Sequence, residues 1–102
     1  MAEERTQPAA KQVQIQIQLD DEVAQGMYVN LALVNHTETE FTIDLMYLQP
    51  QQPRAKVRAR IISSPKHTKR LLLALQENLR RYEERFGALE LSGPNPADQL
   101  LQ

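Results

Sequence analysis

The chain has 102 residues, no cysteine and a formal net charge of −1, from 12 Lys and Arg against 13 Asp and Glu. This length predicts a single domain, and the lack of cysteine excludes disulfides, thiolate nucleophiles and thiolate metal sites. No apolar run approaches the roughly 18 residues of a membrane span, and the polar start MAEERTQPAAKQ does not contain the apolar stretch of a signal peptide. We therefore expect a soluble, cytoplasmic protein without a membrane segment.

Alternation of apolar and polar residues predicts four strands. Residues 1–12 are polar and predict a disordered N-terminal tail. Residues 13–19 then alternate strictly, with Gln14, Gln16 and Gln18 on the polar side, which is typical of a half-buried strand. Similar patterns over 27–33, 41–47 and 55–61 predict three more strands, with their apolar sets on one shared inward face. The short connections favour an antiparallel meander.

A long amphipathic helix follows the predicted strands. Ser64 is a candidate N-cap, Pro65 suits the first turn, and Gly87 is placed to end the helix. Apolar residues recur at steps of three and four, which predicts a helix packed on one face of the sheet; they are Leu72, Leu75, Leu79, Tyr82 and Phe86. Residues 88–102, with two prolines, predict a flexible C-terminal tail. The predicted fold class is α+β, with a single domain over residues 13–87.

Several of these segments also occur together in a known family. They are GMYVN at 26–30, Phe41 with Asp44, IISSPKH at 61–67 running into KRLL at 69–72, LQEN at 75–78, and Tyr82-Glu83 with Phe86-Gly87. In this order they resemble an uncharacterised family of small bacterial and archaeal proteins, domain of unknown function 3467. The resemblance covers nearly the whole predicted domain and supports its boundaries. It implies no activity, substrate or cofactor, because the family has none assigned.

Basic residues are segregated in the middle of the chain. No Asp or Glu occurs between Leu45 and Gln76. Within this window every second residue of the fourth predicted strand is basic, so these side chains should project from one face about 7 Å apart, which matches successive phosphates of a nucleic-acid strand; they are Arg54, Lys56, Arg58 and Arg60. Lys66, Lys69 and the outward-facing Tyr28 are further candidate contacts with an anionic partner.

Pairing within the sheet is the alternative explanation of this basic row. If strands 41–47 and 55–61 form a hairpin, Glu40 and Asp44 lie opposite the row. Opposite charges paired across a sheet contribute roughly 0.2–1 kcal/mol each. Two acids neutralise at most two of the four bases. Tyr28 is also the one aromatic residue predicted on the outward face, which counts against tight stacking of nucleic-acid bases.

The sequence does not support a catalytic or metal site. Ser63, Lys66 and His67 could donate hydrogen bonds to an anion at the helix start, but a serine cap on a proline-started helix accounts for the same segment. His36 and His67 are far apart and show no metal-binding spacing. No glycine-rich elbow accompanies Ser64 and His67. We therefore expect no enzyme activity, no metal, no cofactor and no small-molecule substrate.

Two features predict association of chains. The uncharged Gln14, Gln16 and Gln18 do not discourage pairing of a strand edge, and Leu73 falls on the polar side of the helix between Lys69 and Arg80. We expect a homodimer. The sequence thus predicts a non-enzymatic binding module whose basic sheet face engages an anionic partner, with single-stranded nucleic acid the most testable. The alternative is a protein–protein adaptor or assembly subunit whose basic face pairs internally or with an acidic protein.

Overall fold

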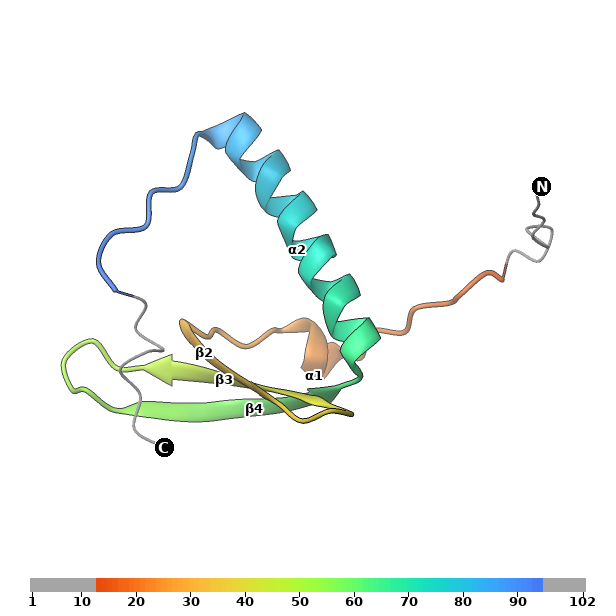
Figure 1. The fold of residues 1–102 in the computed structure, drawn as a ribbon, viewed down its shortest axis with the longest axis horizontal. Coiled ribbons are helices and arrows are strands. Elements are labelled where there is room, and N and C mark those ends of the chain that lie inside the picture. Colours follow the sequence, from red (N-terminus) through yellow and green to blue (C-terminus); the bar gives the residue numbers. More distant parts are fainter. Residues whose placement is uncertain (1–12, 95–102) are drawn as a thin grey trace.

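The computed structural model describes residues 13–94, which form a three-stranded sheet and one long helix (Figure 1). The elements in chain order are α1 (Asp21–Ala24), β2 (Leu31–His36), β3 (Phe41–Leu48), β4 (Ala55–Ser63) and α2 (Pro65–Phe86). The strands are antiparallel in the order β2-β3-β4. The predicted α+β class is confirmed, as are the antiparallel sheet and the helix that follows it. The predicted tail at 1–12 and the last part of the tail at 88–102 lie outside the described residues.

The prediction of a fourth strand at residues 13–19 is wrong for the single chain. This segment pairs with no strand in the described part of the chain, and the single turn of α1 follows it. Its apolar side chains are exposed to solvent, Ile17 to 90%. A strand needs a neighbour for its backbone groups and a cover for its apolar face. The segment keeps the alternation of a strand but has neither a neighbouring strand nor a cover among the residues that the structure describes.

Cross-strand register gives the sheet two apolar faces. Val34 lies opposite Ile43, which lies opposite Ile61. We call this side, which also carries Leu45, the Ile43 face. Leu31 lies opposite Met46 on the other side, the Met46 face.

The prediction that Leu31 and Leu33 share one face with Ile43 and Leu45 is therefore wrong. A register that differs by one residue moves every side chain of a strand to the opposite face. The described residues that are buried, Leu31, Met46 and Asp44, all belong to the Met46 face.

The ends of α2 are formed as the sequence predicts. The backbone N–H of His67 donates to Ser64 Oγ at 3.2 Å, and Pro65 occupies the first turn. At the other end Gly87, with φ of 104°, donates its N–H to the carbonyl of Glu83. Each of these contacts satisfies a backbone group that a helix terminus would otherwise leave unpaired.

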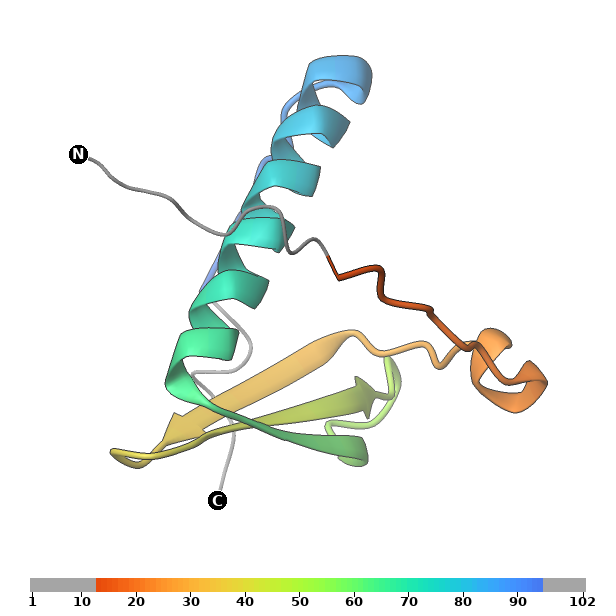
Figure 2. The same ribbon diagram turned by 90° about the vertical axis from the view of Figure 1, so that its right-hand side faces the viewer.

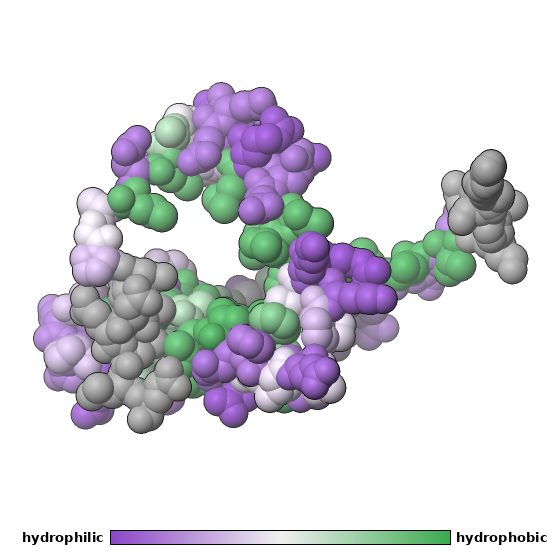
Figure 3. All heavy atoms as spheres, in the orientation of Figure 1, coloured by the Kyte–Doolittle hydropathy of each residue, from purple (hydrophilic) through white to green (hydrophobic). Residues whose placement is uncertain are grey.

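The predicted packing of α2 on the sheet of its own chain is wrong. The helix leaves the end of β4 and rises away from the sheet (Figures 1 and 2), and it makes no extensive contact with the strands. The side of α2 turned toward the sheet is apolar and the outer side is polar (Figure 3). The apolar side chains nevertheless remain about half exposed, Leu75 to 54%. An amphipathic pattern predicts that one face of a helix is covered, but it does not identify the surface that covers it.

Replacing Ser64 with alanine should lower the free energy of unfolding by about 1 kcal/mol, because the N–H of His67 loses its acceptor. Chemical denaturation followed by circular dichroism measures this change. Ser63→Ala is the matched control, since Ser63 Oγ makes only a 3.4 Å contact with the Ser64 carbonyl. If the two variants lose the same free energy of unfolding, the hydrogen bond between His67 and Ser64 does not stabilise the helix.

Candidate anion-binding site

The predicted basic row does not lie on one face of β4, because a β-bulge interrupts the strand. Ala59 is opposite Leu45 and Val57 is opposite Met46, which leaves Arg58 without an opposite residue. Residues on the two sides of the bulge therefore exchange faces. Lys56 lies opposite Tyr47 on the Ile43 face, whereas Arg60 lies opposite Asp44 on the Met46 face. The prediction of a continuous row from Arg54 to Arg60 is wrong for this reason.

Arg60 is neutralised within the sheet. Its Nε donates to Asp44 Oδ1 at 2.7 Å and its Nη2 donates to Asp44 Oδ2 at 2.9 Å, which is a bidentate ion pair. Asp44 is only 5% exposed. The hydrogen bonds from Arg60 hold the pKa of the Asp44 carboxyl below its usual value. Pairing within the sheet thus accounts for Arg60. In the described part of the chain, Glu40 makes no ion pair with the remaining bases.

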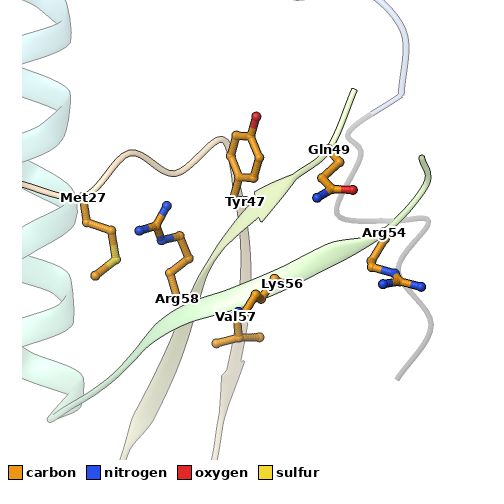
Figure 4. Close-up of a pocket in the computed structure, with 7 residues that line it drawn as sticks. All are labelled: Met27, Tyr47, Gln49, Arg54, Lys56, Val57 and Arg58. Carbon is orange, nitrogen blue, oxygen red and sulfur yellow. The ribbon is translucent and has the colours of Figure 1, made fainter. Parts of the chain in front are cut away.

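The other three bases of the row line one open hollow of about 640 Å³ at the start of β4 (Figure 4). Its lining residues are Met27, Tyr47, Gln49, Arg54, Lys56, Val57 and Arg58. Arg58 and Tyr47 extend to the same side of the sheet, whereas Val57 points to the other side. No acidic residue from the described part of the chain lines the hollow, so the described side chains give it a positive electrostatic potential at neutral pH.

An aromatic side chain, Tyr47, lines this hollow and contacts a second one, Tyr28. The rings of Tyr28 and Tyr47 meet edge to face with centroids 6.3 Å apart, and Tyr28 is 71% exposed. Tyr28 was a predicted contact; the structure brings it next to Tyr47, which lines the hollow, but Tyr28 itself is not a lining residue. Tyr47 was not selected from the sequence, since its alternation with Ile43 and Leu45 places it on an apolar face. Its position at the end of a strand, just before a proline-containing loop, is the signal that could have identified it.

The remaining predicted site residues lie elsewhere. Lys66 and Lys69 are exposed on the first turns of α2 and do not line the hollow. Gln14, Gln16 and Gln18 are exposed in the extended segment. Because the backbone N–H of His67 is already bound to Ser64, the serine cap accounts for the start of α2.

Residues 13–94 contain neither a cluster of metal-binding side chains nor a membrane-spanning helix. Among residues 13–94, no three His, Cys, Asp or Glu side chains come together in a way that could hold a metal ion. No helix in the same range is long and apolar enough to cross a membrane.

The fold and the hollow define a small α+β chain with an open, basic surface site. Over residues 1–91 the sequence matches the family described as a protein of unknown function (DUF3467), and the chain belongs to this family. The resemblance seen in the sequence is thereby confirmed. No curated protein and no solved structure matches the chain.

Proposed function

We propose that the protein is a non-enzymatic binding module whose hollow holds an anionic partner, and that single-stranded nucleic acid is the partner to test first. The observation that carries the proposal is the gathering of Arg54, Lys56 and Arg58 around one hollow that no acidic residue among residues 13–94 lines. Arg60, the fourth base of the row, is already paired with Asp44. The binding surface is therefore smaller than the whole strand and lies at one end of the sheet.

The chemistry of the hollow suits a phosphodiester chain better than an isolated anion. Guanidinium groups bind phosphate oxygens in a bidentate manner, and three separated cations can follow successive phosphates. The exposed ring of Tyr28 offers a face on which a base can stack, worth roughly 1–3 kcal/mol. Phosphate contacts at Arg54, Lys56 and Arg58 together with stacking at Tyr28 predict binding that tolerates different sequences.

Charge reversal at the hollow is the direct test. Fluorescence anisotropy of a labelled single-stranded DNA or RNA oligonucleotide should show at least about tenfold weaker binding for Lys56→Glu/Arg58→Glu than for the wild type, since two phosphate contacts are replaced by repulsion. Raising the salt concentration fourfold should weaken wild-type binding by roughly 20-fold, as expected for about three phosphate contacts.

A matched control separates the hollow from general electrostatics. The control variant Arg70→Glu/Arg85→Glu changes the net charge by the same amount on α2, and neither residue lines the hollow. Its affinity should stay within about twofold of the wild type, because charges beyond a Debye length of about 10 Å are screened. Equal losses in the two variants, or wild-type binding that does not respond to salt, would overturn the proposal.

The alternative function is a protein–protein adaptor or assembly subunit, and the exposed apolar residues of α2 favour it. Leu73, on the polar side of the helix, is 54% exposed. If the basic hollow serves an acidic protein, a labelled polyglutamate peptide should bind while the oligonucleotides do not. Binding of the oligonucleotides alone would favour the first proposal.

A further inference from the structure

We propose that the protein folds as a strand-exchanged homodimer. In this dimer residues 13–19 of each copy extend the sheet of the other copy at the edge of β2, and each α2 covers Val34, Ile43, Leu45 and Ile61 on the Ile43 face of the other copy, away from the hollow at the start of β4. This inference concerns the assembly of the fold and does not rest on the proposed function.

The first observation is that the single chain does not bury its own apolar groups. Among the described residues only Leu31, Met46 and Asp44 are buried. The large apolar residues of α2 stay about half exposed, as do Val34 and Ile61 on the Ile43 face, and those of residues 13–19 are exposed still further. Burial of apolar surface is the main term that offsets the conformational entropy lost on folding. A chain that leaves this much apolar surface in water needs a partner to be stable.

The exposed area matches the requirement of a stable interface. Eight large apolar side chains, six on the apolar side of α2 and two on the Ile43 face, are roughly half exposed. At roughly 150–200 Å² for a large side chain, their covering would bury about 600–800 Å² per chain, close to the roughly 800 Å² that each partner contributes to a standard interface. Residues 13–19 add to this area.

The partner is a second copy of the same chain, because each chain carries two pairs of complementary features that it leaves uncovered. One pair is an unpaired strand-like segment and an open sheet edge. The other is an apolar helix side and an apolar sheet face. A two-fold symmetric exchange satisfies all four features at once in both copies. A different protein would have to supply complementary partners for each of them.

The edge of β2 is favoured over the edge of β4. Natural sheets protect their edges with charged residues and bulges, and β4 carries Lys56, Arg58, Arg60 and the bulge. The sequence of β2, LALVNH, has neither acidic nor Lys or Arg side chains, and its pairing with β3 is regular. The six residues of β2 are also close in number to the seven residues of the segment. The segment would then provide, from the second copy, the fourth strand that its alternation predicts.

Proline substitution in the segment tests the exchange. Multi-angle light scattering should give the wild type twice the 11.7 kDa of the chain. Ile17→Pro removes a ladder donor and should give the mass of a single chain or an unfolded protein. Neither result is expected for an isolated chain, in which Ile17 is 90% exposed and has no strand partner. Leu91→Pro, at an even more exposed position, is the control and should keep the dimer mass.

A second measurement identifies the contact itself. In a mixture of isotope-labelled and unlabelled chains, isotope-filtered NMR should show contacts between residues 13–19 of one copy and β2 of the other. A single-chain mass for the folded wild type would overturn the proposal. A dimer that survives Ile17→Pro, or that lacks these intermolecular contacts, would also overturn it.

Discussion

Tenfold dilution of the protein should lower the free energy of unfolding, expressed per dimer, by about 1.4 kcal/mol, if folding and association of two copies are one transition. The reason is mass action, since two unfolded chains must meet to form one folded unit. Association would bury the apolar side chains of α2 and of residues 13–19, which are exposed in the single chain. This prediction rests on the strand-exchanged dimer.

Thermal and denaturant unfolding followed by circular dichroism at tenfold steps of protein concentration measures the effect. The midpoint should rise at each step, and helix and sheet signals should be lost together. Ser64→Ala provides an internal check, because it lowers every midpoint but leaves the dependence on concentration unchanged. Curves that superimpose at all concentrations would show that a single chain is stable, against this prediction.

The helix is the part of the fold that the sequence predicts best, because its signals are local. Ser64, Pro65 and Gly87 lie within or next to the segment that they delimit, and each makes a backbone arrangement that needs no distant residue. Glu77 with Arg81, four residues apart, likewise forms the ion pair expected from their spacing.

The sheet was predicted less well because faces depend on register. Leu31 and Ile43 each alternate with polar or small residues, but nothing in either strand specifies which residue lies opposite. The bulge at Arg58 could not be predicted for a related reason. A basic residue occurs at every second position of the sequence whether or not a bulge moves the following residues to the opposite face. Arg54, Lys56 and Arg58 line one hollow while Arg60 lies on the other face beyond the bulge, an arrangement that the alternation alone does not predict.

Residues 13–19 show a different limit. Their alternation describes the environment in which the segment is stable, but it does not say which chain provides that environment. Residues 20–94 of the same chain provide no strand next to them. The amphipathic pattern of α2 is limited in the same way, since it predicts that one helix face is buried but does not identify the surface that packs against it. Both differences between prediction and structure are removed if a second copy supplies the missing neighbours.

Arg60→Ala should destabilise the protein at neutral pH at least about twice as much as Asp44→Asn, although the two changes remove the same ion pair. The difference follows from burial. Asp44 is 5% exposed, so without Arg60 its carboxylate is left desolvated and unpaired. The Arg60 side chain is 63% exposed and remains hydrated when Asp44 loses its charge. Denaturant unfolding of both single variants and of the double variant measures the asymmetry.

The pH dependence distinguishes this mechanism from a simple loss of packing. In the wild type Arg60 lowers the pKa of Asp44 below its usual value of 3.8, so the stabilisation is present above that pH and is lost as pH falls through the lowered pKa. In Arg60→Ala, burial without a partner should raise the pKa of Asp44, and protonation should then relieve the penalty. The stability difference between wild type and Arg60→Ala should therefore shrink from neutral pH to about pH 4. Arg80 and Arg81 lower the pKa of Glu77 to about 2 in both proteins, so its contribution cancels. A difference that stays constant with pH would assign the loss to packing of the Arg60 side chain instead.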